Sequence, residues 1–459
     1  MKTLLAGLLI IVSSAWCLDI VSTTFPATSA TLWIIRQEAL YLTGLLSIAL
    51  MSLSMLLSIR PGWLEKPLGG LDRVYRLHKW SGILAISFGA AHWLVKQSGG
   101  LIKLVIGTEG RLPKTEYSKF IDLLRELGDE MGEPGLYIML AMLVITLWRR
   151  FPYHIWRQLH RGMPVLYLML AFHAAILAPP AYWTQPVGVL LGGLIAVGTI
   201  ASVIALAGLI GRHRKASGKI VSVSNEGDVT ELTCRLDENW ESHRPGQFAF
   251  ITFSQLKESP SFIKGDLRIG ILLHRFRGAH PFTIACADRG DQTITFYIKA
   301  LGDFTKTIAR RVQVGQSVTV EGPYGRFQLD RHSPRCRQVW VAGGIGVTPF
   351  LAWLESLMLR PSEVHCVDFH YCTRDREADR FVNRLQVLCS ALPGVRLFIH
   401  SEKHGEVLTA QSLKATDDQA KKTEVWFCGP RGLAEGLRKG MKDTWNGRWR
   451  FHQEAFEMR

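Results

Sequence analysis

Residues 71–96 read LDRVYRLHKWSGILAISFGAAHWLVK and place two histidines, His78 and His92, fourteen positions apart in an apolar stretch. A later apolar stretch carries His160 and His173, thirteen positions apart. Fourteen and thirteen residues of α-helix rise roughly 21 Å and 20 Å. If both helices cross a membrane in the same direction, the four imidazoles form two pairs at matching depths.

Six apolar stretches of spanning length precede residue 211, and each approaches the ~20 residues that a membrane-crossing helix needs. The first of them also has the composition of a cleaved signal peptide, because Met1-Lys2 precedes a short apolar run. The rest of the chain is a charged alternation of short strands and helices. The six predicted spans lie at about residues 4–22, 37–58, 75–95, 135–151, 160–180 and 186–210.

The formal net charge of +15 lies largely in short segments beside the apolar stretches, so it indicates membrane topology and not a nucleic-acid partner. The loops 59–76 and 149–161 are rich in Arg and Lys, which predicts that they are cytoplasmic. The connection 96–134 then falls on the opposite side, and the sixth span ends inside at Arg212. The eight cysteines form no CxxC motif, so we expect reduced, mostly structural thiols.

The second half of the chain is predicted to contain two domains after a linker at 212–219. Residues 220–333 are rich in short strands, which indicates a small β-barrel. Residues 334–459 alternate strand, glycine-rich turn and helix, which is typical of a doubly wound α/β nucleotide-binding domain. The expected fold is therefore a multidomain membrane protein with a six-helix transmembrane bundle followed by these two domains.

The paired histidines are candidate haem ligands, because neutral imidazole binds haem iron well and two facing imidazoles hold one haem. A single intramembrane histidine more often caps a helix or bonds to a neighbouring helix. Four at paired depths favour two b-type haems in the domain 1–211, an inner one between His78 and His160 and an outer one between His92 and His173. Two histidines at the same depth in the membrane do not necessarily point toward each other.

At about 100° per residue, His92 lies about 40° from His78 around its helix, but His173 lies about 140° from His160. An ideal helix does not present the second pair to one partner. Gly162 follows His160 closely, with Pro164 two residues later, and a distorted or late helix start there would change the direction of His160.

The chain resembles the NADPH oxidase and ferric reductase superfamily. Leu71-Asp72-Arg73 followed by His78-Lys79 is similar to the start of the family's third helix, and the histidine spacings match its haem ligands. The resemblance implies a ferric reductase-like transmembrane domain with ferredoxin-reductase-type FAD and NAD(P) domains. It also implies that the iron ligands are His78, His92, His160 and His173.

Two stretches in the predicted barrel resemble the family's FAD motifs. The first is His280-Pro281-Phe282-Thr283, which outside this context is an ordinary turn into a strand. The resemblance implies that the Thr283 hydroxyl and the neighbouring backbone hold the flavin. In the second, Gly302 permits close approach of the backbone to the pyrophosphate, and Thr305 at a predicted helix start adds an anion contact.

Glycine-rich turns in the predicted nucleotide domain resemble the family's NAD(P) motifs. Gly343, Gly344 and Gly346 follow a strand, and Thr348 and Pro349 open a helix, which is the setting for a dinucleotide phosphate at a helix N-terminus. Cys428-Gly429-Pro430 resembles the nicotinamide-side motif. The resemblance implies that Cys428 is a positioning residue and not a nucleophile.

The preference for NADPH over NADH is predicted from Arg374, which ends a strand and suits bidentate contact with a 2′-phosphate. The alternatives are that it is a solvated surface arginine, or that Arg376 or Arg380 takes the role; NADH then stays open as the donor. Near the C-terminus, the resemblance makes Phe456 the aromatic residue that stacks on the flavin and moves for hydride transfer. Three residues follow it here, whereas in many family oxidases that aromatic residue is the last.

The resemblance implies a transmembrane flavocytochrome b that passes electrons from cytoplasmic NADPH through FAD and two b haems to an extracytoplasmic acceptor. Ferric iron and O₂, which gives superoxide, are equally ranked acceptors. Lys96 stands where family oxidases have a further histidine, and Arg36 is expected either to contact a haem propionate or anionic product or to anchor its helix. No calcium-binding loop of EF-hand spacing occurs, so activity is expected to be constitutive.

An alternative is a haem-bearing reductase subunit that feeds a quinone or a separate extracytoplasmic partner protein. In either case membrane lipid surrounds the chain, and the oligomeric state is open. The compact design favours a bacterial inner membrane, with the FAD and NAD(P) domains in the cytoplasm.

Overall fold

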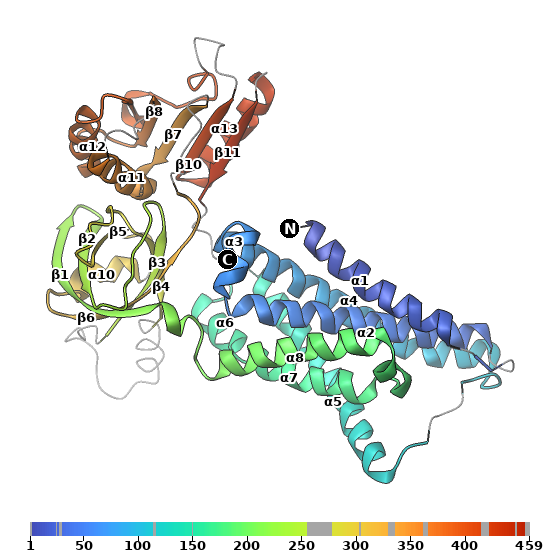
Figure 1. The fold of residues 1–459 in the computed structure, drawn as a ribbon. Helices are drawn as coiled ribbons and strands as arrows, with labels where there is room; N and C mark the ends of the chain where they lie inside the picture. The colour runs from blue at the N-terminus through green and yellow to red at the C-terminus, as the bar shows by residue number, and fades with distance from the viewer. Residues whose placement is uncertain are drawn as a thin grey trace. The chain divides into compact units, whose positions relative to one another are not determined.

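The computed structural model divides the chain into two compact units, Met1–Ile210 and Gly211–Arg459 (Figure 1). Each unit is described by itself. The residues that the structure describes are 2–23, 25–26, 30–112, 116–148, 150–254, 278–302, 304–328, 336–360, 366–414, 422–445 and 448–454.

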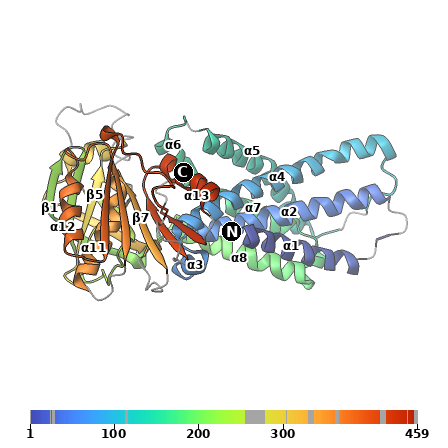
Figure 2. The ribbon, with the colours of Figure 1, turned by 90° about the horizontal axis from the view of Figure 1, so that it is seen from above.

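The first unit is all-helical, and its long helices lie side by side in both ribbon views (Figures 1 and 2). α2 is its most buried helix and packs against α1, α4, α7 and α8, while α5 packs against α4 and α7. The elements are α1 (Lys2–Ser22), α2 (Thr31–Ser58), α3 (Gly62–Leu68), α4 (Leu71–Ile106), α5 (Lys119–Leu147), α6 (Tyr153–His160), α7 (Met163–Leu177), η1 (Pro180–Thr184) and α8 (Pro186–Leu206).

Five helical stretches in the described part of this unit are long and apolar enough to cross a membrane: α1, α2, α5, α8 and Ile155–Leu177, which covers most of α6 and α7. The helix α4, with 36 residues, is not among the five. The fourth predicted span began at residue 135, but α5 continues through Pro134 back to Lys119. The start was misplaced because a proline inside a helical pattern usually marks an end, whereas here Ser118 caps the helix instead.

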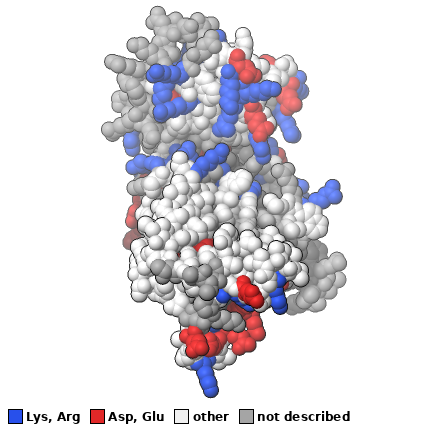
Figure 3. Space-filling model, turned by 90° about the vertical axis from the view of Figure 1, so that its right-hand side faces the viewer, with Lys and Arg blue, Asp and Glu red and all other residues white. Residues whose placement is uncertain are grey.

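The outside of this unit is largely apolar, unlike that of a water-soluble bundle, and small polar contacts join its buried helices. Uncharged atoms dominate it in Figure 3, with acidic side chains gathered at the lower end of that view. Inside, the Ser54 and Ser81 hydroxyls are 2.7 Å apart, and the Ser52 hydroxyl lies 2.8 Å from that of Tyr167. Outward-facing apolar residues include Ile10, Leu18, Val21, Leu94, Leu104, Val144, Val189 and Ile200.

The second unit begins with a six-stranded antiparallel sheet in the order β4-β3-β6-β1-β2-β5. Ile284, the residue after β4, bridges Phe296 in β5 and so brings the two edges of the sheet together. The described elements of this lobe are β1 (Lys215–Glu226), β2 (Val229–Leu236), β3 (Phe248–Phe253), β4 (His280–Thr283), β5 (Thr293–Lys299), α10 (Thr305–Arg311) and β6 (Ser317–Tyr324), preceded by η2 (Arg212–Arg214).

The predicted linker 212–219 is shorter than expected, because β1 already begins at Lys215 and pairs there with Glu321 of β6. The stretch Lys215-Ala216-Ser217-Gly218 contains no β-branched or aromatic residue, so its strand character comes from pairing and not from local propensity.

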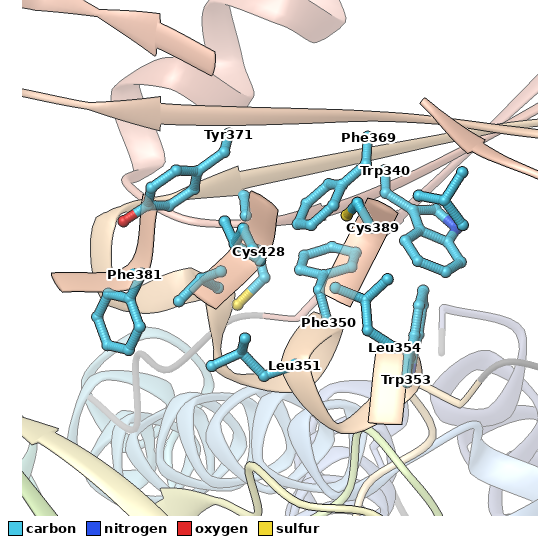
Figure 4. Close-up of a cluster of buried hydrophobic side chains, with 14 of the residues drawn as sticks. Trp340, Phe350, Leu351, Trp353, Leu354, Phe369, Tyr371, Phe381, Cys389 and Cys428 are labelled. Atoms are coloured by element: carbon cyan, nitrogen blue, oxygen red, sulfur yellow. The ribbon is translucent and has the colours of Figure 1, made fainter. Parts of the chain in front are cut away.

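The second lobe of this unit is a five-stranded parallel sheet in the order β11-β10-β7-β8-β9. One face is packed with aromatic side chains, including Trp340, Trp353 and Phe369, which are 0 % exposed (Figure 4). The described elements are β7 (Arg337–Gly343), η3 (Gly344–Val347), α11 (Thr348–Leu359), β8 (Val367–Thr373), α12 (Arg380–Ser390), β9 (Val395–Ser401), η5 (Glu402–His404), β10 (Thr423–Cys428), α13 (Arg431–Thr444) and β11 (Trp449–Gln453).

Candidate functional site

The helical unit brings the four candidate histidines together as the two predicted pairs. The ring centroids of His78 and His160 are 6.0 Å apart, and their planes are inclined by 83°. Those of His92 and His173 are 6.3 Å apart and inclined by 82°. Both first members come from α4, so one continuous helix sets the spacing between the pairs.

The angular position of His160 is explained by an interruption of the helix. α6 ends at His160 and α7 begins at Met163, so the two histidines on this side do not belong to one helix. The N–H of Gly162 bonds to the carbonyl of Leu159 at 2.9 Å, which closes a turn between the helices. The structure therefore has the distorted helix start that Gly162 and Pro164 suggested.

Three of the four imidazoles are fixed through Nδ1 by a backbone carbonyl of a neighbouring helix. His78 is bonded to Ser54 at 2.9 Å, His92 to Leu40 at 2.9 Å and His173 to Gly128 at 2.7 Å. A histidine that binds a metal through Nε2 commonly donates its other N–H in this way, which fixes the tautomer and the ring orientation.

His160 differs from the other three, because its buried Nδ1 has no hydrogen-bond partner among the described residues. Its ring instead stacks on Trp156, with centroids 4.9 Å apart and planes inclined by 17°. The indole N–H of Trp156 donates to the Thr146 hydroxyl of α5 at 2.8 Å. Packing therefore takes the place of a hydrogen bond at this ring.

The histidine pairs fit an iron ion that receives its other ligands from a porphyrin. Two imidazoles bound at about 2 Å on opposite sides of one metal have ring centroids roughly 6 Å apart. No cluster of three or more metal-ligating side chains occurs among the described residues, so a bare metal ion lacks a full ligand set here. Pairs suit haem, which supplies four ligands of its own.

Glycines give the helix backbones clearance around the His92–His173 pair. A Cβ atom added to Gly44 of α2 would lie 3.1 Å from Nδ1 of His92, and one added to Gly132 of α5 would lie 2.6 Å from Cε1 of His173. Both glycines therefore allow a neighbouring helix to approach a histidine ring more closely than any other residue permits.

Polar side chains surround the far end of α4, beyond His92. The Lys96 ammonium lies 2.7 Å from Asp129 of α5, and the Lys96 carbonyl accepts a hydrogen bond from Arg36 at 2.8 Å. The indole of Trp93 donates to Glu133 at 3.3 Å. Arg36 thus has a contact that holds α2 to α4, and its predicted contact with a propionate or product stays a prediction.

The first predicted FAD motif forms β4 and contains a threonine with a buried hydroxyl. Thr283 is 5 % exposed, and its Oγ1 has no hydrogen-bond partner among the described residues. Pro281 and Phe282 pair with Phe250 and Ala249 of β3. The ring of His280 stacks on Phe304 at 3.6 Å with an inclination of 4°. A buried hydroxyl of this kind is expected to bond to a ligand.

The second predicted FAD motif is a loop whose backbone N–H groups bond to the side chain of its own threonine. Thr305 is the first residue of α10, and its hydroxyl accepts hydrogen bonds from the N–H groups of Leu301 and Gly302, each at 2.9 Å. A Cβ added to Gly302 would meet nothing within 4 Å, so its surroundings are open. The hydroxyl of Thr305 shapes the loop, and its contact with a phosphate stays a prediction.

The two predicted NAD(P) motifs lie against each other at the ends of neighbouring parallel strands. Ala342 of β7 pairs with Cys428 of β10. A Cβ at Gly346 would collide with the Cys428 carbonyl, one at Gly343 would lie 2.6 Å from the Pro430 ring, and one at Gly429 would lie 2.9 Å from the Gly343 nitrogen. Ligands bind beyond the carboxyl ends of strands in such sheets.

Other residues of the first NAD(P) motif form the turn into α11. Gly344 has φ +53°, a left-handed conformation that favours glycine. Thr348 opens α11 with its hydroxyl bonded to the Ile345 carbonyl at 3.1 Å, and Pro349 follows in the first turn, where its missing N–H costs nothing.

Cys428 has the environment of a positioning residue. It is 0 % exposed, and Figure 4 shows its thiol turned into the aromatic cluster and not away from it. Burial, with a further contribution from the Glu454 carboxylate, raises the pKa of the thiol well above its usual range. Because only the thiolate is strongly nucleophilic, this cysteine is unsuited to covalent catalysis.

Of the three arginines considered for the 2′-phosphate, only Arg374 has no ion pair among the described residues. It is exposed and follows β8 directly. Arg376 is paired with Glu406, and Arg380 with Glu226 and Glu231. The alternatives are therefore engaged in holding the fold together, which favours Arg374.

The predicted flavin-stacking residue Phe456 lies outside the described residues. The chain before it is placed: β11 pairs with β10, and the N–H of Glu454 donates to the Phe427 carbonyl at 3.2 Å. A Cβ at Gly325 would lie 3.6 Å from Oε1 of Glu454. The C-terminal segment thus runs beside Gly325, which follows the last strand of the first lobe.

An ion-pair network between the two lobes was missed in the sequence. Arg384 of α12 contacts Glu231 of β2, Tyr297 of β5 and Glu355 of α11. The carboxylate of Glu355 also accepts from the Ala287 N–H at 3.3 Å. No local pattern reveals these residues as partners, because the tertiary fold brings them together from distant parts of the chain.

Comparison with known proteins finds a family model in each half of the chain. Residues 43–171 match the family model of the ferric reductase-like transmembrane component, and residues 214–328 match that of an FAD-binding domain. A vanillate O-demethylase oxidoreductase from Pseudomonas sp. (strain HR199 / DSM 7063) is 29% identical over 152 residues, which cover 33% of this chain and 45% of the relative. NADPH oxidase 3 from Homo sapiens is 27% identical over 214 residues, covering 35% of this chain and 37% of the relative.

The matched region spans less than half of each of these relatives. Among solved structures, a flavohemoglobin from Malassezia yamatoensis with bound FAD and heme superimposes with a TM-score of 0.48 and 15% sequence identity, covering 94% of this chain and 100% of that one. The stretch 214–328 is thus similar to an FAD-binding domain. With its apolar helices and both family matches, the chain is similar to the ferric reductase and NADPH oxidase superfamily over its transmembrane and FAD-binding stretches.

Proposed function

We propose that this protein is a transmembrane flavocytochrome b that passes electrons from cytoplasmic NADPH through FAD and two b haems to extracytoplasmic ferric iron or O₂. The observation that carries the proposal is the geometry of the histidines: two pairs, with ring centroids 6.0 Å and 6.3 Å apart, spaced along one continuous helix. Bound flavin converts a two-electron hydride donor into one-electron steps, and haem iron carries single electrons.

In this proposal the chain holds each haem between α4 and the α6–α7 side of the bundle. The carbonyls of Ser54, Leu40 and Gly128 hold Nδ1 of three of the imidazoles, which would leave their Nε2 atoms to bind iron. The helix α4 is then a sixth membrane span despite its charged ends. Its packing against α2 and α5 suits a helix that carries cofactor ligands.

The basic loops support an orientation with the reductase half in the cytoplasm of a bacterial inner membrane. Arg73 and Arg76 stand at the start of α4, and Arg157 and Arg161 lie within and just after α6. Arginine collects on the cytoplasmic side of membrane helices. His78 and His160 are then the inner pair, and His92 and His173 the outer pair.

At the donor end, residues of the two lobes hold and orient the cofactors. The buried hydroxyl of Thr283 is the proposed hydrogen-bond partner for the flavin. The glycines Gly343 and Gly346 let the first turn pack directly against the turn at Cys428, while the surroundings of Gly344 are open for a dinucleotide. The guanidinium of Arg374 is the proposed partner of the 2′-phosphate.

At the acceptor end, the half-exposed ion pair joins Lys96, one turn beyond His92 on α4, to Asp129 of α5, the helix whose Gly128 carbonyl bonds to His173. Family oxidases have a further histidine where this chain has Lys96. The side chain here is a cation that is already paired with Asp129. We infer that the acceptor is a small one-electron oxidant that approaches the edge of the outer haem beside this ion pair.

Anaerobic stopped-flow absorption of the purified full-length protein tests the proposal. NADPH should bleach the flavin first and then produce the bands of reduced b haem. Reoxidation with a ferric chelate or with O₂, with superoxide assayed, then identifies the acceptor. Flavin bleaching without any haem reduction contradicts the proposed path. Reduced haem that neither oxidant reoxidises contradicts the proposed acceptors and directs the search to a quinone or a partner protein.

A further inference from the structure

We infer that the His78–His160 site is also a binding site for a small neutral diatomic ligand, which takes the place of His160 on reduced haem iron. The inference rests on the proposed haem ligation. It starts from an asymmetry among the four imidazoles: three are fixed through Nδ1 by backbone carbonyls, whereas Nδ1 of His160 has no partner within the described part of the chain. A ligand without its outer hydrogen bond typically binds a metal 10–100-fold more weakly.

The position of His160 in the chain gives it freedom that the other ligands lack. It is the last residue of α6, a helix of 8 residues, and the chain turns at Arg161 and Gly162 before α7 begins. His78 and His92 lie inside α4, and His173 lies inside α7. A residue at a helix end can shift with local changes in the turn, whereas one inside a helix moves only with the helix.

Trp156 is the contact that opposes this shift. Its ring lies one helical turn before His160 and stacks on the imidazole at 4.9 Å. The indole is itself held to α5, because its N–H donates to the Thr146 hydroxyl at 2.8 Å. Trp156 therefore packs against one face of the imidazole and is itself held in place.

The chemistry of the surroundings selects the class of ligand. The partly buried imidazole lies against the rings of His78 and Trp156, so an anion would lose part of its hydration there. A neutral diatomic that accepts electron density from ferrous iron has no such cost. In the exchange the bond between iron and Nε2 of His160 breaks and a bond between iron and the diatomic forms, with no change in electron count and no proton transfer.

Carbon monoxide is the probe, with the full-length protein reduced anaerobically by dithionite. Absorption spectra during a titration give the fraction of haem that binds, and haem and flavin assays on the same sample give the cofactor content. We expect one of the two haems to bind carbon monoxide at a concentration 10–100-fold lower than the other.

Three substitutions assign the site. Trp156→Leu should lower the carbon monoxide concentration for half-saturation by about tenfold, because the imidazole loses its stacking partner. Thr146→Val, which removes only the acceptor of the indole N–H, should produce a smaller change in the same direction and serves if Trp156→Leu does not fold. Trp93→Leu is the matched control, because Trp93 is also bonded to α5 but stacks on no histidine among the described contacts.

The outcomes separate the two claims. If two low-spin haems are present and both resist carbon monoxide, or both bind it equally, His160 is not exchangeable and the inference is wrong. The same follows if Trp93→Leu and Trp156→Leu have equal effects. If the protein carries flavin but no haem, the proposed function itself fails.

Discussion

The helical unit and the two-lobed unit build their sites in opposite ways. In the helical unit the candidate groups are four side chains, His78, His92, His160 and His173, each set at one place on a helix. In the two-lobed unit the NAD(P) site is built from the absence of side chains at glycines such as Gly346. The first kind of site is damaged by removing a side chain, and the second by adding one.

The largest effect should come from removing one histidine. In His92→Leu, one axial ligand of the outer haem is gone, so the purified protein should contain about half the haem of the wild type. Reduction of the external acceptor should fall at least a hundredfold, while bleaching of the flavin by NADPH stays unchanged. Pyridine-haemochrome analysis and stopped-flow absorption measure the two quantities.

The matching change in the other unit adds a side chain. In Gly346→Val the new side chain collides with the Cys428 carbonyl, so the turn must shift. The shifted turn should bind the dinucleotide less well. We expect NADPH to reduce the flavin at least tenfold more slowly, with haem content unchanged. Gly436→Ala is the control, because a Cβ there meets nothing within 4 Å. Equal loss in both variants would point to general destabilisation.

A smaller effect is expected at Arg374, whose contact with the 2′-phosphate is a single charge-assisted interaction. Such a bond contributes about 1.5–3 kcal/mol, so Arg374→Ala should raise the KM for NADPH roughly tenfold or more and leave the KM for NADH unchanged. Steady-state kinetics with both donors measure this. In Arg376→Ala, which breaks the pair with Glu406, the ratio of the two KM values should not change.

The smallest effect concerns stability and pH in the nucleotide-binding lobe. Burial, and to a lesser degree His400, lowers the pKa of His370 to about 4. The unfolded chain therefore binds a proton below about pH 6.5 that the folded lobe does not bind until about pH 4, so stability is full above pH 6.5 and falls as the pH drops.

Replacing the titrating ring should flatten this dependence. In His370→Gln the amide can still bond to His400, whose Nε2 lies 3.0 Å from Nδ1 of His370 in the wild type. Between pH 7 and pH 4.5 the wild type should lose roughly 1 to 3 kcal/mol more of its free energy of unfolding than the variant. Flavin fluorescence during thermal unfolding measures the difference. An identical pH dependence of the two proteins would show that His370 titrates normally.

Much of the site could be predicted because it follows local patterns. The matching depths of His78 with His160 and of His92 with His173 follow from their spacings and from the loop charges, although the direction of His160 does not. The contact between the turns at Gly346 and Cys428 follows from their places at the ends of parallel strands. In both cases regular geometry translates sequence distance into position in space.

Other features depend on contacts that no local pattern carries. The early start of β1 at Lys215 arises from pairing with β6, and the continuation of α5 through Pro134 runs against propensity. The missing hydrogen bond of His160 is a property of the break between α6 and α7 and of the helices around it. Hydrogen-bond partners on different helices cannot be predicted from the sequence alone.

Haem content together with electron paramagnetic resonance of the oxidised full-length protein tests the central claim most directly. The two histidine pairs predict two low-spin ferric haems per FAD in the wild type, and one in His92→Leu. A protein that keeps its FAD but contains no haem, or whose haem is high-spin and unaffected by His92→Leu, would contradict the proposed electron path.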